Sequence, residues 1–389
     1  MIATIVSTTD NDKHTQPVMQ NRVPILYTPR PADFRPRDYL GDPMAPLTVE
    51  APLMDQGIRA SISCINPDGS ITDLGNVLMR ADNPQIAYSA CSPPKEYTTL
   101  SGHVQICRVL KRMDEYAGLT FELSPRWVAV KVSFQSEMDR LKEQGIREDS
   151  RHEISIMQQL GNIPNVATCL AALLVEDIND RGNTSYNLVM PHFDGGDLSS
   201  VIFSSPYDHT PGIPEDDARP LFRKIMQGLR TIHDSGICHG DLSPHNIMIG
   251  HEGQAYVIDF GMALRVPYTN HNEHRRCLIG PQGVFGKLRH MAPEIYAQRL
   301  AFDSEAIDVW SAGTILWCMV TGHKSYEIPS GTDNLYRQMV NQLPLLLRNM
   351  DKHLSPECVH LLRCMLRATP RMRYSIDEVL KHPWVQHQG

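Results

Sequence analysis

The chain of 389 residues contains no apolar run near the roughly 18 residues that a membrane-spanning helix needs. Residues 1–10 also lack the charged stretch and following apolar stretch of a secretory signal. No segment repeats at a fixed period. Hydrophobic residues make up 41% and charged residues 21%, which are ordinary proportions for a globular protein. We therefore expect a soluble cytoplasmic protein that has no membrane partner.

Positive charge and paired cysteines are also scarce. The formal net charge is −7, whereas a surface that binds nucleic acid needs concentrated basic residues, so we expect no nucleic-acid partner. The nine cysteines are odd in number and scattered, and no two have the C-x-x-C spacing. This pattern favours reduced thiols in a cytosolic compartment over a disulfide framework or a zinc site.

Prolines punctuate the first part of the chain and leave it weakly periodic. Six of them fall between residues 24 and 46: Pro24, Pro29, Pro31, Pro36, Pro43 and Pro46. We expect residues 1–95 to be a partly disordered extension, which would suit a regulatory partner. One ordered hairpin is predicted within it, around the turn sequence Asn66-Pro67-Asp68-Gly69.

The next part of the chain reads as a small sheet with one helix. In residues 127–132, strand alternation puts Trp127, Ala129 and Lys131 on one face and three valines on the other. A helix is predicted around residues 147–160. Strand-like runs follow at residues 170–175 and 186–190.

After Gly195-Gly196 the apolar spacing becomes helical. A helix is predicted over residues 218–233, behind Pro214 and an acidic first turn, and others over residues 309–320, 356–366 and 376–380. The predicted fold class is therefore α+β, with a small, mostly antiparallel sheet followed by a larger, mostly helical part.

The most informative stretch is His239-Gly240-Asp241-Leu242-Ser243-Pro244-His245-Asn246, which is followed by an apolar run and by Asp259-Phe260-Gly261. Hard oxygen donors at a fixed separation suit a magnesium nucleotide. The stretch resembles the H-R-D-L-x-x-x-N and D-F-G motifs of eukaryotic protein kinases. The resemblance implies that Asp241 orients the attacking hydroxyl and accepts its proton, while Asn246 and Asp259 hold Mg²⁺.

Further matches assign the ATP site by the same resemblance. Val128-Ala129-Val130-Lys131 resembles the V-A-I-K strand, whose lysine contacts the α- and β-phosphates, and Glu153 resembles its partner on helix αC. Tyr186 to Leu198 resembles the strand and hinge around adenine. Met190 would be the gatekeeper, Phe193 would give the backbone donor, and Asp197 would reach the ribose.

The matches extend to the part of a kinase that supports a protein substrate. Ala292-Pro293-Glu294 resembles the A-P-E motif, Arg373 would pair with Glu294, and Asp308 would receive backbone N–H groups of the catalytic loop. The resemblance implies a bilobal kinase domain over residues 96–387. Its N-lobe, with helix αC, would span residues 96–190, its hinge 191–196 and its C-lobe 197–387.

Two departures concern the phosphates. In the glycine-rich loop, only the final G-x-V is present, as Gly102-His103-Val104, and Tyr97 and Thr99 stand where the first glycines would be. Ser243 replaces the lysine that Ser/Thr kinases carry two residues after the catalytic aspartate. Lys287 occupies the facing position, so we expect a lysine swap that brings its ammonium near Ser243 and Asp241.

A third departure concerns regulation. Gly240 replaces the arginine of H-R-D, and the hydroxyls between Gly261 and Ala292 are those of Tyr268 and Thr269. A phosphate on this segment would need an arginine to dock against. We therefore expect activity without phosphorylation of the segment.

Three functions remain open from the sequence. The first is a Ser/Thr protein kinase that uses ATP and Mg²⁺ and acts on a protein substrate. The second is a pseudokinase scaffold, favoured by the loss of glycines before Lys131. The third is a small-molecule kinase, which His239-Gly240-Asp241 resembles, although Glu294, Asp308 and Arg373 speak against it.

Overall fold

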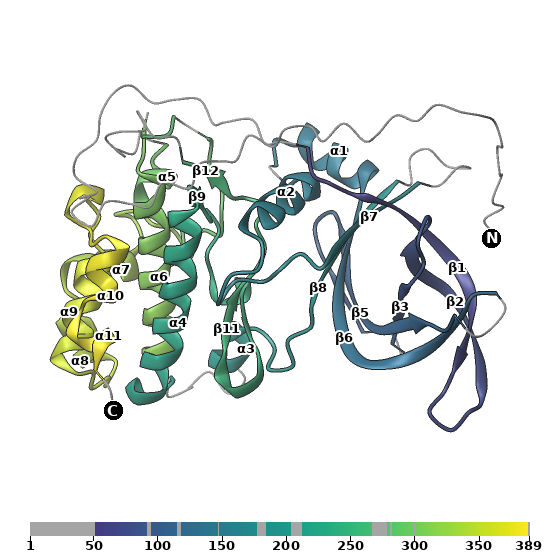
Figure 1. Ribbon diagram of the computed structural model, residues 1–389. Helices are drawn as coiled ribbons and strands as arrows, with labels where there is room; N and C mark the ends of the chain where they lie inside the picture. The colour runs from purple at the N-terminus through teal and green to yellow at the C-terminus, as the bar shows by residue number, and fades with distance from the viewer. Residues whose placement is uncertain are drawn as a thin grey trace. The chain divides into compact units, whose positions relative to one another are not determined.

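The computed structural model describes residues 51–91, 95–114, 118–146, 148–176, 184–203, 212–266, 278–280, 282–298 and 301–387. Most of the expected extension, including the six prolines named above, lies outside these residues. Of the described residues, 52–151 and 169–192 form one compact unit, and 152–168 and 193–387 form a second. The first is built mainly from strands and the second mainly from helices (Figure 1).

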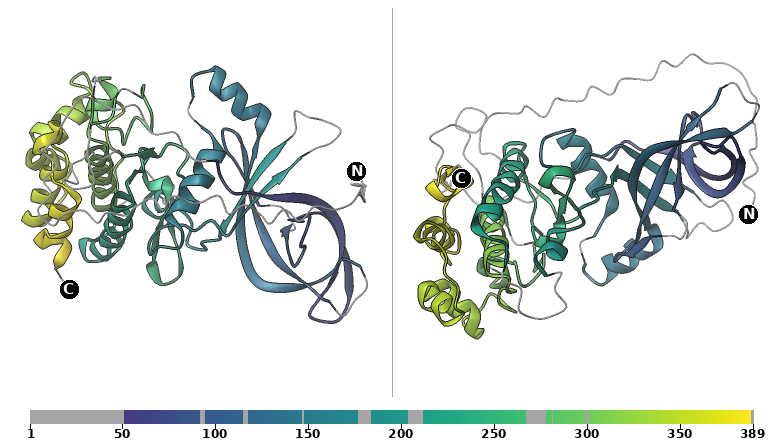
Figure 2. Two further views of the ribbon diagram at one scale, coloured as in Figure 1. Left: turned by 45° about the horizontal axis from the view of Figure 1, so that its top comes forward. Right: turned by 90° about the horizontal axis from the view of Figure 1, so that it is seen from below.

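Eight strands of the first unit form one curled sheet (Figure 2). They are β1 (Asp55–Ile65), β2 (Ile71–Arg80), β3 (Ile86–Ala90), β4 (Glu96–Thr98), β5 (Gly102–Arg112), β6 (Thr120–Phe134), β7 (Ala171–Val175) and β8 (Ser185–Pro191). Their order is β3-β2-β1-β7-β8-β6-β5-β4, and β3 also pairs with β5 and β1 with β6. Only β1 pairs in parallel, with β6 and β7, so the sheet is mostly antiparallel as expected.

The predicted hairpin is confirmed as the β1–β2 turn. Ile65 pairs with Ile71, the Asn66 N–H donates to the Ser70 carbonyl at 2.8 Å, and Gly69 takes a φ of 81°. The ordered sheet, however, begins ahead of the boundary expected at residue 95, because β3 pairs with β5 and β1 with β7. On β1, Ile62 and Cys64 join one apolar cluster, and at the end of β2, Val77 joins the same cluster while Leu78 joins another.

Alternation along β6 follows the prediction. Val128, Val130 and Val132 lie in one apolar cluster with Leu173 of β7 and other strand residues, whereas Trp127 on the opposite face is 40% exposed. Lys131 is buried on the same face as Trp127. The burial of an amino group among strands differs from the solvent exposure that is usual for lysine.

The described residues form eleven helices, which include the five predicted from the sequence and six that were not predicted. They are α1 (Gln135–Glu143), α2 (Ser150–Leu160), α3 (Leu198–Phe203), α4 (Glu215–Asp234), α5 (Pro293–Tyr296), α6 (Ser304–Thr321), α7 (Asn334–Asn341), α8 (Leu343–Asn349), α9 (Pro356–Met365), α10 (Ile376–Leu380) and α11 (Pro383–Gln386). A short antiparallel pair, β9 (Ile237–Cys238) with β12 (Leu264–Arg265), and a short hairpin, β10 (Ile247–Ile249) with β11 (Ala255–Val257), complete the second unit.

Helix α6 forms the core of the second unit. All of its residues are buried, and it runs beside α4 (Figure 1). Asp303 begins it by accepting the N–H groups of Glu305 and Ala306, and Gly322 ends it in the left-handed conformation. Although α6 is buried on every side, no helix of the described ranges is long and apolar enough to cross a bilayer. The expected small sheet with a larger helical part is confirmed.

Gly102 gives a stability test of the sheet. A Cβ at this position would lie 2.0 Å from the Val132 carbonyl oxygen of β6, while a Cβ on Gly75 of β2 would meet nothing within 4 Å. Gly102→Ala should lower the free energy of unfolding by about 1–3 kcal/mol, because the strands must separate. Gly75→Ala is the matched control and should change it by less than about 0.5 kcal/mol. Equal urea midpoints for the two variants would contradict the packing described.

Candidate active site

A hairpin fixes the spacing between the two predicted metal ligands. Strands β10 and β11 pair antiparallel, so Asn246 before β10 faces Ile258 after β11, and the Ile258 N–H donates to the Asn246 carbonyl at 3.0 Å. Asp259 follows at once, with a φ of 66°. This register brings residues that are 13 positions apart in sequence to the same end of one hairpin.

The Asp241 carboxylate is held from two sides. The Asn246 side-chain amide donates to the Asp241 carbonyl at 2.8 Å and to its Oδ2 at 3.0 Å. The Lys287 N–H donates to Oδ1 at 2.8 Å, and the Lys287 ammonium lies 2.5 Å from Oδ2. The structure therefore brings Asp241, Asn246 and Lys287 together. The Lys287 ammonium is the cation that the sequence predicted near Asp241.

Asn246 and Asp259 fit a magnesium ion by the chemistry of their donors. Both hydrogens of the Asn246 amide group point to Asp241, which leaves the amide oxygen for a cation. Magnesium prefers such hard oxygen ligands, and Asp259 supplies a carboxylate at the same end of the hairpin. The pair could hold Mg²⁺ together with the phosphates of its nucleotide.

Asp308 of α6 anchors the loop that carries Asp241. Its two carboxylate oxygens accept the N–H groups of His239 and Gly240 at 2.7 and 2.9 Å, as predicted from sequence. The His233 ring donates to the same carboxylate at 2.9 Å. Burial alone would raise the pKa of Asp308, but the hydrogen bond and charge of His233, with those of the loop, lower it below the usual value. The carboxylate is therefore ionised when the loop is in place.

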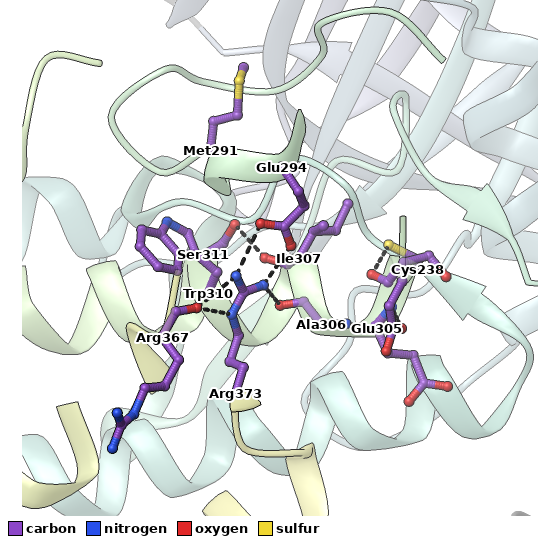
Figure 3. A network of polar contacts seen from close by, with 12 residues as sticks. Cys238, Met291, Glu294, Glu305, Ala306, Ile307, Trp310, Ser311, Arg367 and Arg373 are labelled. Atoms are coloured by element: carbon purple, nitrogen blue, oxygen red, sulfur yellow. Dashed lines mark hydrogen bonds and ion pairs between the residues drawn. The ribbon is translucent and has the colours of Figure 1, made fainter. Parts of the chain in front are cut away.

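The predicted pair of Glu294 and Arg373 is also confirmed (Figure 3). The guanidinium donates to both carboxylate oxygens, at 2.7 and 3.0 Å, and both side chains are almost fully buried. Arg373 also donates to the Ala306 carbonyl at 2.7 Å and lies over the Trp310 ring. The pair connects the end of the 286–294 segment to α6. Replacing only one of the two side chains would leave the charge of the other buried without its partner.

Gly195 at the predicted hinge is explained by close backbone approach, and Gly196 by its φ of 69°. The Gly195 N–H donates to the Ile249 carbonyl at 2.9 Å, and a Cβ on Gly195 would lie 2.6 Å from that oxygen. Phe193 stacks on Tyr256 of β11, with ring centroids 4.4 Å apart. The Phe193 side chain thus packs on β11, and the predicted contact with adenine would be made by the Phe193 backbone.

Asp197 has local partners of its own. It accepts the Ser200 N–H at 2.6 Å at the start of α3 and lies 4.0 Å from the His245 ring. Ser199 lies 3.4 Å from the other ring nitrogen of His245. Asp197, the residue predicted to bind the ribose, therefore lies beside the catalytic loop. Its interaction with His245 was not predicted.

In the first unit, the remaining predicted ATP residues lie on neighbouring strands. Strand β6 pairs Lys131 with Val104 of β5, and Ala129 with Met190 of β8. Gly102 begins β5, but the Val132 oxygen explains its missing side chain without reference to a nucleotide. These residues thus gather on three adjacent strands, β5, β6 and β8.

Lys131 and Glu153 fall in different units, and their pairing stays a prediction. Each side chain is buried, Glu153 on α2 and Lys131 on β6. Beside Glu153, His152 contacts the Ala263 carbonyl at 2.7 Å, just after Asp259-Phe260-Gly261. This link between α2 and the segment that follows Asp259 was not predicted, because no local pattern in the sequence signals a contact 111 residues apart.

The fold and the hydrogen bonds around Asp241 agree with the resemblance found in the sequence. A family model described as "Protein kinase domain" matches residues 121–385, which is more than half of the chain. The chain therefore belongs to the protein kinase family. Membership implies, in general terms, the use of ATP with Mg²⁺ and action on proteins.

Curated relatives are similar over part of their length. A mouse protein named "Sperm motility kinase Tcr mutant form" is 33% identical over 51% of this chain and 37% of its own. The fission yeast "Serine/threonine-protein kinase chk1" is 32% identical over 54% and 40%. The rice "CBL-interacting protein kinase 25" is 27% identical over 66% and 46%. The alignments thus span less than half of each of these relatives.

His290 gives a pH test of the segment that carries Lys287. Burial, and then the cations Lys287, His245 and Arg289, lower the pKa of His290 from its usual 6.5 to about 3. Between these values the unfolded chain binds a proton that the folded chain does not, so stability falls as pH falls. His290→Gln should make the free energy of unfolding less steep with pH, by up to about 1.4 kcal/mol per unit.

The measurement is the urea midpoint at several values from pH 7 down to 5. His353→Gln is the control, since the His353 side chain is 88% exposed. It should keep the wild-type slope. A slope in His290→Gln equal to that of the wild type would show that His290 does not stay neutral in the folded protein.

Proposed function

We propose that the protein transfers the γ-phosphoryl group of ATP to Ser or Thr hydroxyls of protein substrates. The observation that carries the proposal is the Asp241 carboxylate, held by the Asn246 amide and the Lys287 N–H on a loop that Asp308 anchors. Phosphoryl transfer depends mainly on positioning and on charge stabilisation, and this arrangement supplies both. Similarity to the yeast protein named as a serine/threonine kinase supports the hydroxyl class.

Asp241 is the group that orients the attacking hydroxyl and accepts its proton. Asn246 and Asp259 would hold Mg²⁺, which supplies charge neutralisation at the β- and γ-phosphates. Lys131, with Glu153 as its partner, would meet the α- and β-phosphates. Gly102, Val104, Ala129, Met190, Phe193 and Asp197 complete the proposed nucleotide site.

Lys287 is proposed to supply the cation that Ser243 cannot. The Ser243 side chain is fully buried, and its hydroxyl has no hydrogen-bond partner among the described residues. The Lys287 ammonium lies beside Asp241 and its side chain is 39% exposed, so it is accessible to a substrate. A cation at this place stabilises negative charge on the transferring phosphoryl group.

The proposed kinase domain covers residues 96–387, with β1, β2 and β3 added to the sheet of its N-lobe. A pseudokinase scaffold is the second candidate, because Tyr97 and Thr99 stand at the glycine positions and Tyr97 is 60% exposed on β4. Binding of Mg-ATP in a thermal shift without any transfer to a peptide array would favour this scaffold.

The direct test of the function is Asp241→Asn. Loss of the proton acceptor should lower kcat for transfer of ³²P from ATP to an array peptide by about 100- to 10,000-fold. Binding of Mg-ATP should persist, because the amide keeps the shape of the side chain. Asp351→Asn is the control, since that side chain is 95% exposed, and it should keep full activity. Equal kcat in the wild type and Asp241→Asn would refute the function.

The lysine swap has its own test. Lys287→Met should lower kcat by about 100-fold, as removal of one charge-stabilising donor does in other enzymes. Lys287→Arg should recover part of the loss because it keeps the positive charge. Lys381→Met changes an exposed lysine after α10 and serves as the control. If Lys287→Met matched that control in kcat, Lys287 would be a solvated loop residue only.

A further inference from the structure

Two glycines meet where the catalytic loop touches the segment of residues 284–291. Gly240 has a φ of 77° and Gly286 a φ of 84°, in the region that disfavours side chains. A Cβ on Gly286 would lie 2.8 Å from the Gly240 carbonyl oxygen. A Cβ on Gly240 would lie 2.8 Å from the Met262 carbonyl and 3.1 Å from the Phe285 ring. Gly286 therefore reaches the Gly240 carbonyl because it lacks a side chain, and Gly240 likewise leaves room for the Met262 carbonyl and the Phe285 ring.

The Phe285 ring occupies the space beside Gly240. It is 6% exposed, and its centroid lies 5.9 Å from that of Phe302. Phe302 is itself buried and pairs with Ile279 through two backbone hydrogen bonds of 3.0 Å. An apolar contact thus links the catalytic loop to the residues that lead into α6.

Each glycine is next to a residue that bears on catalysis. Asp241 follows Gly240, and Lys287 follows Gly286 and donates its N–H to the Asp241 carboxylate at 2.8 Å. Gly240 and Gly286 each precede one of the two residues joined by this hydrogen bond. A displacement of Phe285 would therefore move the backbone at both glycines and change the orientation of the Asp241 carboxylate. The geometry makes Phe285 a candidate for positioning, without contact to any substrate.

Hydrogen bonds to side chains and backbone carbonyls hold residues 289–291 of the segment. Ser311 donates to the His290 carbonyl at 2.8 Å, and His290 bonds Thr314 at 2.8 Å. Tyr326 donates to the Met291 carbonyl at 2.8 Å, and Arg289 donates to the Ser325 carbonyl at 3.2 Å. These partners lie on α6 or in the loop that follows it. They would keep the segment in place in an unmodified chain.

We propose that Phe285, packed between Gly240 and Phe302, is a positioning residue for Asp241, so that the segment works without being phosphorylated. The proposal rests on the proposed kinase activity for its catalytic consequence. An aromatic ring takes the place of an ionic clamp, since Gly240 has no side chain to bind a phosphate. The cost of misplacing a catalytic group by about 1 Å is of the order of 100-fold in rate.

The kinetic test compares Phe285→Ala with Phe285→Leu, and uses Leu345→Ala, a half-exposed position on α8, as the control. Phe285→Ala should lower kcat about 10- to 100-fold and leave KM for ATP within about twofold. Phe285→Leu should recover most of the rate because it refills the space. In the Asp241→Asn background, Phe285→Ala should have no further effect, because it acts through that carboxylate. Unchanged kcat, or full additivity, would overturn the positioning role.

A second measurement tests the contact without using activity. Hydrogen exchange at the backbone of residues 286–289 should be at least about tenfold faster in Phe285→Ala, while exchange in α6 stays as in the wild type. Equal exchange at residues 286–289, or faster exchange throughout α6, would overturn the proposal. Phosphatase treatment of the wild type should leave kcat unchanged, and a large loss would overturn the regulatory part. If the wild type transfers no phosphate, the proposed function fails and the exchange data still decide the contact.

Discussion

A buried carboxylate supports the whole candidate site. Asp308 lies fully inside the second unit, where an ionised group is costly unless donors surround it. The N–H groups of His239 and Gly240 and the His233 ring provide those donors. The two loop N–H groups cannot both reach Asp308 unless the backbone turns at Gly240, and that turn presents Asp241. The conformation of the catalytic loop thus follows from the need of the buried Asp308 carboxylate for hydrogen-bond donors.

The resemblance to kinase motifs predicted the residues of this site, including the contact of Lys287 with Asp241 over 46 positions of the chain. Asn246 and Asp259 are joined by one short hairpin, so their proximity follows from the register of β10 and β11. The close approach of Gly240 and Gly286 beside this contact was not predicted, because it depends on two positive φ angles that the motifs do not specify. The hairpin of β1 and β2 was predicted, whereas β3 and the place of these strands in the main sheet were not. Their pairings with β5 and β7 join separate parts of the chain, so no local pattern reveals them.

The same comparison separates what the fold requires from what the nucleotide requires. Gly102 remains in the eroded glycine-rich loop, and the carbonyl oxygen of Val132 already excludes a side chain there. No such packing demand is seen at Tyr97, which is 60% exposed. Retention of Gly102 is therefore explained by strand packing, whereas Tyr97, at an expected glycine position, bears on the proposed phosphate binding. For this reason, affinity for ATP and competence of the Asp241 loop are independent questions in this chain.

Charge pairing around Asp241 bears on how a substrate enters. Two carboxylates of the loop region have a partner in the chain: Asp241 pairs with Lys287, and Asp197 lies 4.0 Å from the His245 ring. A carboxylate oxygen accepts more than one hydrogen bond, so the Lys287 ammonium and a substrate hydroxyl can both bind Asp241. Under the proposed function, a nucleotide phosphate would offer that ammonium a second partner, and a substrate arginine would meet His245 beside Asp197. The Lys287 side chain, 39% exposed, would in this way link phosphate binding to the catalytic carboxylate.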